Sequence, residues 1–113
     1  MTRIFPNLVA RLYILLACAA SSPAFAAGSS DIAAGHALAS ARCAACHAVD
    51  KQGDSPLAAA PPFRTLARNY PLENLEEALA EGIFAGHPDM PADPWEPADI
   101  QRLIAYLKTI QTP

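Results

Sequence analysis

Apolar residues recur with helical spacing in three stretches of this 113-residue chain, most clearly near its C-terminus. There they follow one another at i, i+3, i+4, i+7 and i+10, the pattern of an amphipathic helix with one buried stripe. The stripe consists of Ile100, Leu103, Ile104, Leu107 and Ile110. Pro97 suits the first turn of a helix, and Asp99 just after it suits the helix dipole. We therefore predict that the last helix begins at Pro97.

A second helix is predicted between Ser30 and Cys43. Ser30 is expected as its N-cap, with Asp31 in the first turn. Its apolar face would consist of Ile32, Gly35, Leu38 and Ala39. Because glycine inside a helix costs about 1 kcal/mol relative to alanine, Gly35 indicates close approach of another helix. His36 falls on the other side and is interpreted as a surface histidine.

The third helical stretch is predicted from Pro71 to Gly82. Its buried stripe would be Leu72, Leu75, Leu79 and Ile83, and its early glutamates Glu73, Glu76 and Glu77 are read as a solvated face. Residues 50 to 60 have the composition of a loop, and a short helical turn with Phe63, Leu66 and Ala67 should follow. The chain is therefore predicted to be all-α, with about four short helices.

Residues 1 to 26 have the features of a secretory signal peptide. Arg3 and Arg11 supply positive charge, and the nine-residue apolar run from Leu12 to Ala20 is too short to span a bilayer, which takes ~20 residues. The Ala24-Phe25-Ala26 triplet then matches the small-x-small cleavage pattern. We predict export to a bacterial periplasm and cleavage after residue 26.

Cleavage would leave one small domain, residues 27 to 113. Cys18 follows a short Leu-Leu-Ala run that resembles a lipobox, so membrane attachment through a lipid on Cys18 or through an uncleaved signal stays open. The predicted domain has six basic and eleven acidic residues, a formal charge of −5. This charge excludes nucleic acid as a natural partner and argues against binding to an anionic membrane.

The most specific chemistry is in Cys43-Ala44-Ala45-Cys46-His47, which reads C-x-x-C-H. Two thiols at this spacing can form thioether bonds with the two vinyl groups of a porphyrin, and the adjacent imidazole can then bind the iron. A thioredoxin-like redox pair would need a βαβ context, a zinc site would need a fourth ligand at metal spacing, and a disulfide here would close too short a loop to stabilise much. The motif predicts one covalently attached haem c.

Met90 is the strongest candidate for the second axial ligand. It would be the only methionine after cleavage, and it lies between Pro88 and Pro91 in an irregular segment after His47. A lone methionine is ordinarily a core filler, but a proline-bounded loop favours ligation of the iron by its thioether. His87 and an unfilled sixth position are the alternatives.

Two further residues have a predicted role beside the haem. A carbonyl of the rigid segment Pro61-Pro62 can accept a hydrogen bond from Nδ1 of the proximal histidine, which would fix the ring and raise its basicity. Stiffening of the loop is the alternative role for these prolines. Trp95 either packs on the haem edge or closes the core.

Together these residues resemble the class I mono-haem cytochromes c, in particular short bacterial periplasmic members, from about Gly35 to Leu107. The resemblance implies that the N- and C-terminal helices cross, with Gly35 against the aromatic residue Tyr106. It also implies that Pro61 is the family's carbonyl acceptor, with Phe63 two residues on. Ala39 departs from the aromatic residue often found at its position. The haem site is expected to comprise Cys43, Cys46, His47, Met90, Pro61, Phe63, Leu66, Leu75, Leu79 and Trp95.

The resemblance implies an electron carrier rather than an enzyme, with no small-molecule substrate. Its partners would be redox proteins such as a periplasmic dehydrogenase, a bc-type complex or a terminal oxidase. A dedicated haem subunit of a dehydrogenase is one alternative, and a haem sensor or peroxidase-like protein with a labile sixth ligand is another. The family's lysine ring is absent, and the basic residues expected near the haem edge are Arg42, Lys51, Arg64 and Arg68.

Overall fold

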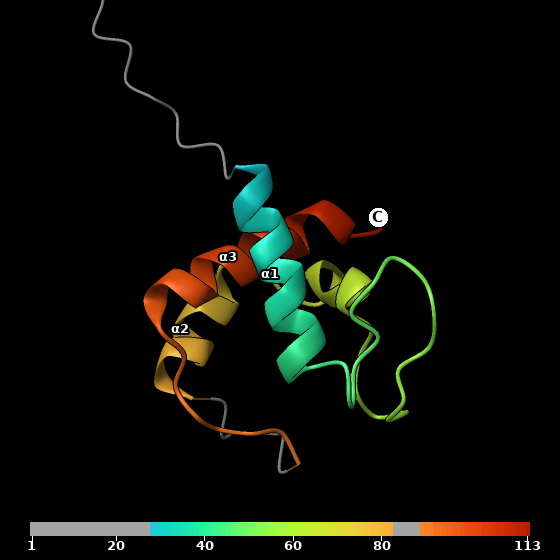
Figure 1. The fold of residues 1–113 in the computed structure, drawn as a ribbon. Helices are drawn as coiled ribbons and strands as arrows, with labels where there is room; N and C mark the ends of the chain where they lie inside the picture. The colour runs from blue at the N-terminus through green and yellow to red at the C-terminus, as the bar shows by residue number, and fades with distance from the viewer. Residues whose placement is uncertain (1–27, 83–88) are drawn as a thin grey trace, which may run out of the picture.

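Two 14-residue helices, α1 (Ser29–Arg42) and α3 (Pro97–Ile110), cross each other and form the frame of the molecule (Figure 1). The computed structural model describes residues 28–82 and 89–113. The predicted signal peptide, Cys18, Ile83 and His87 lie outside these residues. Along the chain, a 3-10 helix, η1 (Phe63–Arg68), and a short helix, α2 (Asn74–Glu81), come after α1 and before α3. The described residues contain no strand, so the predicted all-α class is confirmed.

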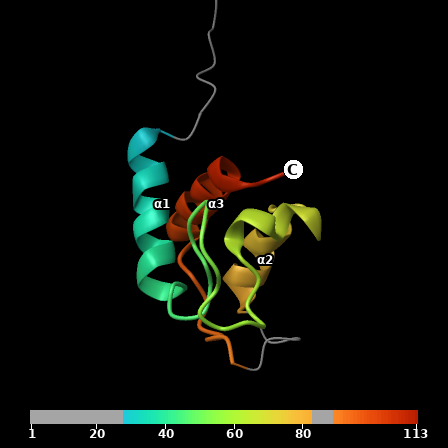
Figure 2. The same ribbon diagram turned by 90° about the vertical axis from the view of Figure 1, so that its right-hand side faces the viewer.

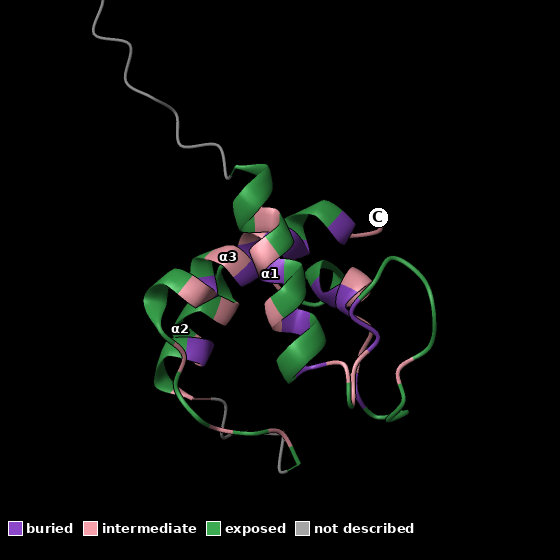
Figure 3. Cartoon of the chain, in the orientation of Figure 1, coloured by how far each residue is buried: buried purple, intermediate pink, exposed green. Residues whose placement is uncertain are grey.

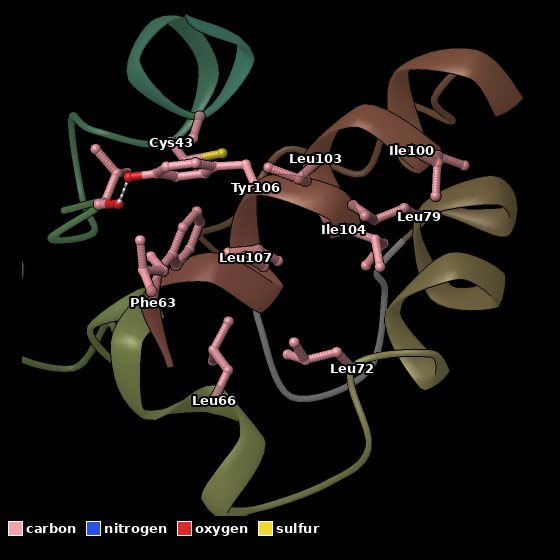
Figure 4. Packing of buried hydrophobic residues seen from close by; sticks show 13 residues of the cluster. Cys43, Phe63, Leu66, Leu72, Leu79, Ile100, Leu103, Ile104, Tyr106 and Leu107 are labelled. Carbon is pink, nitrogen blue, oxygen red and sulfur yellow. Dashed lines mark hydrogen bonds between the residues drawn. The ribbon is translucent and has the colours of Figure 1, made fainter. Parts of the chain in front are cut away.

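The α3 helix lies between α1 on one side and η1 and α2 on the other (Figure 2). Its predicted start at Pro97 is confirmed, and all five residues of its apolar stripe are buried. The apolar stripe is therefore part of the buried core, whereas most residues of α1 and α2 are exposed (Figure 3). Leu107 is the most deeply buried large side chain, with 1% of its surface exposed. Figure 4 shows this core around α3.

The crossing of α1 and α3 is possible because position 35 is glycine. A Cβ atom at Gly35 would overlap the backbone carbonyl of Arg102 and lie 2.8 Å from the Cβ of Tyr106. Both contacts are with α3, and a separation under 3 Å is closer than carbon atoms pack. The close approach predicted from Gly35 is therefore confirmed.

The predicted N-cap of α1 is wrong, because the helix begins one residue before Ser30. Gly28 is the N-cap, and its carbonyl accepts from the backbone N–H groups of Asp31 (3.0 Å) and Ile32 (3.2 Å). Ser30 lies inside the first turn and makes no capping hydrogen bond. The first helical hydrogen bonds are thus accepted by the backbone of Gly28, two residues before Ser30, and the pattern of side chains did not indicate this residue.

The start of α2 also differs from the prediction. Residues 71–73 form a turn with i→i+3 bonds, such as the one from Asn74 N–H to the Pro71 carbonyl (3.1 Å), and the α-helix begins at Asn74. Gly82 has φ +89° at the C-cap, so the predicted end is confirmed. Leu72 and Leu79 are buried and Leu75 is half-buried, as the stripe predicted.

The loop between α1 and η1 has no regular structure, as its composition predicted. Two hydrogen bonds fasten it to Ala48: Ser55 Oγ accepts from the Ala48 N–H (3.0 Å), and Phe63 N–H donates to the Ala48 carbonyl (2.9 Å). The short helical turn predicted around Phe63 and Leu66 is present as η1 and buries both side chains. The loop thereby returns the chain to Ala48, the residue directly after His47.

Candidate functional site

The C-x-x-C-H motif forms one tight turn at the C-terminal end of α1. Cys43 donates its backbone N–H to the Ala39 carbonyl (2.9 Å), and the Cys43 carbonyl accepts from the N–H groups of Cys46 (3.1 Å) and His47 (2.9 Å). Residues three and four apart in such a turn face the same side. The turn therefore directs the Cys43, Cys46 and His47 side chains to one cavity, which all three line.

The two cysteines of the turn are both free thiols, with Cys43 buried and Cys46 half-buried. Burial raises the pKa of the Cys43 thiol to about 11, although the charge of Arg42 opposes the shift. Reactive thiols of redox enzymes have a lowered pKa, because the thiolate is the nucleophile. The environment of Cys43 thus argues against the thioredoxin-like alternative.

The imidazole of His47 is held in one orientation. Its Nδ1 lies 2.8 Å from the carbonyl oxygen of Pro61, which can only accept, so Nδ1 carries the proton. The Phe63 ring packs against the imidazole with 5.0 Å between ring centroids. The predicted hydrogen bond to Pro61 is therefore confirmed. In a neutral imidazole with its proton on Nδ1, the lone pair is on Nε2, which is then the atom that can bind a metal.

The cavity has a volume of about 490 Å³, within the range of cofactor and ligand pockets. One wall consists of residues 42–47 and 57–61, and the other of residues from 89–95, which we call the Met90 segment. Six of the ten predicted haem-site residues line it: Cys43, Cys46, His47, Pro61, Met90 and Trp95.

Four predicted haem-site residues do not line this cavity: Phe63, Leu66, Leu75 and Leu79. Phe63, Leu66 and Leu79 belong to the buried core, and Leu75 is partly buried against it. Phe63 still touches the site through the His47 ring. Any direct contact of these four with a haem stays a prediction.

Leu57 is a lining residue that sequence analysis missed. Its N–H donates to the Cys46 carbonyl (3.1 Å), which holds it beside the attachment turn, and 40% of its surface is exposed. It is the one large apolar residue among those described that is this exposed. A leucine followed by three alanines in an otherwise polar loop was the available signal.

Of the four basic residues expected near the haem edge, only Arg42 lines the cavity. Arg64 donates to the Gly53 carbonyl (2.7 Å), and Arg68 donates to the carbonyl of Pro113 (2.9 Å). The Arg42 guanidinium carbon instead lies 3.8 Å from the ring centroid of Trp95. Sequence analysis did not anticipate this pairing.

The lining is acidic on the side of the Met90 segment. Asp89 and Asp93 both line the cavity and are both exposed. Between Arg68 and Arg102 the chain has eight carboxylates and no lysine or arginine. Asp89 and Asp93 therefore give this side of the cavity negative charge, while Arg42 is the basic residue of the lining.

His36 is exposed, as predicted, but it belongs to a network that sequence analysis missed. Its Nε2 lies 2.9 Å from Asp50 Oδ1, and its ring centroid is 4.9 Å from that of Tyr106. The Tyr106 hydroxyl donates to the Val49 carbonyl (2.8 Å). Burial, reinforced by the charge of Asp50, raises the pKa of Tyr106 to about 12. These contacts tie the chain just after His47 to the α1–α3 crossing.

Two further features are absent from residues 28–82 and 89–113: a cluster of metal-binding side chains and a membrane-spanning helix. No group of three or more His, Cys, Asp or Glu side chains there could hold a metal ion. None of the helices in this part of the chain is long and apolar enough to cross a membrane.

The donor set fits a covalently attached haem. Two thiols and an imidazole with a free Nε2 face one mostly apolar cavity, and the thioether of Met90 lines it from the other wall. A family model, described as Cytochrome c, matches residues 32–111. Comparisons with curated proteins and with solved structures gave no match. Since the family match covers both walls of the cavity and all four helices except the first turn of α1, the chain belongs to the cytochrome c family.

Proposed function

We propose that this protein carries single electrons between redox partner proteins through one haem c. Cys43 and Cys46 would attach the haem, and His47 and Met90 would bind its iron from opposite walls. The observation that supports this most is that His47 and Met90 line the same cavity from segments more than 40 residues apart. The chain can therefore fill both axial positions with its own side chains.

When bound, the haem would supply reversible one-electron exchange between Fe(II) and Fe(III). The role of the chain is to keep the ligand set unchanged during that exchange. The Pro61 carbonyl orients His47 and raises its basicity. The soft thioether of Met90 favours Fe(II) and so raises the potential. With both positions filled, no position is left for a substrate, which favours a carrier over an enzyme.

The partner would approach the mouth of the cavity, near Cys46. Leu57 supplies an exposed apolar contact there, and Asp89 and Asp93 supply negative charge. Brief redox encounters use small interfaces, and complementary charge speeds them. We propose a periplasmic partner that presents a basic surface, belonging to a dehydrogenase, a bc-type complex or a terminal oxidase.

The test is the spectrum of the purified haem protein and of a Met90→Ala variant. We expect the oxidised wild type to show the thioether-to-iron charge-transfer band, and the reduced wild type not to bind carbon monoxide. Met90→Ala should lose the band, bind carbon monoxide and have a lower potential, because water or no ligand replaces the thioether.

An unchanged spectrum and potential in Met90→Ala would contradict the axial assignment. Carbon monoxide binding by the reduced wild type would favour the sensor or peroxidase-like alternative. Purification from the native host distinguishes a free electron carrier from a dedicated haem subunit of a dehydrogenase. A stoichiometric catalytic subunit that stays bound through the purification would identify a dedicated haem subunit rather than a free carrier.

A further inference from the structure

The two walls of the cavity meet at Arg42 and Trp95. Arg42 is the last residue of α1 and directly precedes Cys43, and its guanidinium carbon lies 3.8 Å from the Trp95 ring centroid. This separation is well within the range of a cation–π contact. Both residues line the cavity. The contact therefore joins the attachment turn to the segment that contains Met90.

The Arg42 side chain contacts the tryptophan ring rather than a carboxylate. The ion pairs of the described residues involve Arg102, Lys108 and His36, and none involves Arg42. Arg42 is nevertheless close enough to Cys43 for its charge to lower the thiol pKa against burial. Its side chain thus extends from the attachment turn across to the tryptophan.

Trp95 is fastened on its other side to the rest of the fold. Its backbone N–H donates to the Leu79 carbonyl of α2 (3.0 Å), and its ring is partly buried against the core. Pro97, two residues later, begins α3. The C-terminal end of the Met90 segment is therefore anchored, and Arg42 adds a contact from the opposite wall.

We propose that the Arg42–Trp95 contact is a latch that positions Met90. In the closed state the contact holds the Met90 segment against the attachment turn, which keeps the thioether at the axial position. Both residues act through Met90, so they are positioning residues. This inference rests on the proposed function, because it requires that Met90 bind the iron.

The latch has a measurable consequence for added ligands. Imidazole can bind the oxidised iron only in molecules from which Met90 has moved away, so its apparent affinity is proportional to the population of that open state. A cation–π contact at an exposed site is worth about a two- to fivefold change in such a population. We therefore expect Arg42→Ala to raise the apparent imidazole affinity by about two- to fivefold.

The experiment is a double-mutant cycle on the purified haem protein. Imidazole binding is titrated in the wild type, Arg42→Ala, Trp95→Leu and the double variant, following loss of the thioether-to-iron band. If the two side chains act as a unit, each single variant raises the affinity and the double variant adds little further. Arg42→Lys keeps a cation able to contact the ring, so we expect it to recover part of the wild-type value.

Arg68→Ala is the matched control, because Arg68 is an arginine that does not line the cavity. It should leave the imidazole affinity unchanged. Unfolding curves of all variants show whether Trp95→Leu has loosened the core. Since Arg42 is exposed, Arg42→Ala should lower the unfolding midpoint by no more than this one weak contact contributes, and so tests the latch even if the tryptophan variant is much less stable.

Two outcomes overturn the latch. An unchanged imidazole affinity in Arg42→Ala shows that the contact does not position Met90. Fully additive effects in the double variant show that Arg42 acts on the haem or its substituents rather than through Trp95. Failure of the proposed function looks different, because a wild type that lacks the thioether-to-iron band does not have Met90 bound at all.

Discussion

The α1–α3 crossing and the Met90 segment hold the two sides of the haem cavity in different ways. The crossing brings Gly35 against the backbone of Arg102 and the Cβ atom of Tyr106, and the buried stripe of α3 packs in the core beside it. The Met90 segment has no regular structure. Near its C-terminal end it is held at Trp95, by one backbone hydrogen bond, one cation–π contact and the partly buried ring. A region with few buried contacts opens more easily than a packed core.

This difference suggests that, in the proposed carrier, one region holds the haem and the other controls exchange of the second iron ligand. Covalent attachment and His47 depend on the attachment turn, which continues directly from α1 and is tied to the crossing through Tyr106. The second ligand depends on the weaker segment. Changes at the crossing should therefore alter global stability, whereas changes near Met90 should alter ligand exchange and electron transfer with little effect on unfolding.

The largest expected effect comes from Gly35→Ala. The added methyl would overlap the Arg102 carbonyl, and because that atom is backbone, the helices must move apart. We expect a loss of about 3 kcal/mol in the free energy of unfolding, measured by urea denaturation, in spite of alanine's better helix propensity. Ala37→Leu, on the exposed face of the same helix, is the control and should change stability by less than about 0.5 kcal/mol. Equal stabilities of Gly35→Ala and the wild type would show that the crossing is not tight.

A smaller effect on the same region is expected from Tyr106→Phe. The ring stays packed, but the hydroxyl no longer donates to the Val49 carbonyl. Loss of one such bond lowers the free energy of unfolding by about 0.5–1.5 kcal/mol near neutral pH. Urea denaturation measures it, and no loss would mean that the hydroxyl does not fasten the chain after His47 to the crossing.

The pH dependence of the same variant gives a second readout. The pKa of Tyr106 rises from 10.0 to about 12 on folding, so the folded state keeps a proton that the unfolded chain releases first. The stability that this provides is fully present below pH 10 and is lost as the pH rises towards 12. Tyr106→Phe should flatten this alkaline loss. Tyr70→Phe is the comparison: burial also raises the pKa of Tyr70, so this variant should remove a separate part of the alkaline loss and leave the part due to Tyr106 in place.

The smallest expected effect concerns the charge beside the Met90 segment. Asp89 and Asp93 should repel anionic redox reagents and attract cationic ones. We expect Asp93→Asn to speed reduction by an anionic reagent and slow reduction by a cationic one, by about twofold for each unit charge on the reagent at low salt. Stopped-flow rates at several ionic strengths measure this. Glu76→Gln, on α2 and outside the cavity lining, is the control. Identical salt dependence in Asp93→Asn and the wild type would contradict a negative cavity mouth.

The elements predicted well were those whose signals are local. The α3 stripe and the Gly82 end of α2 follow from periodicity and from backbone freedom, which act over a few residues. The start of α1 was predicted wrongly because the N-cap is Gly28, which has no capping side chain, and Ser30 lies inside the first turn. Helix starts depend on such details of the backbone, and residue types specify them only loosely.

In the site, too, some features could be predicted from the sequence and others depended on how the chain folds. The hydrogen bond from His47 to Pro61 was predictable because the resemblance supplied its partner. The position of Leu57 was not, because it depends on how the loop folds back onto Cys46. Nor was the placing of Leu66 and Leu79 in the core away from this cavity, because an apolar residue suits either surface equally well.

By itself, the sequence determined the attachment chemistry and the helical framework. The spacing of Cys43, Cys46 and His47 is a property of one turn, and the apolar stripe of α3 is a property of one helix. Only the tertiary structure decided which distant surfaces meet: His36 with Asp50 and Tyr106, and Arg42 with Trp95. The physical reason is that an arginine or a histidine on an exposed helical face has many possible partners. The partner that it contacts depends on how the rest of the chain packs around that face.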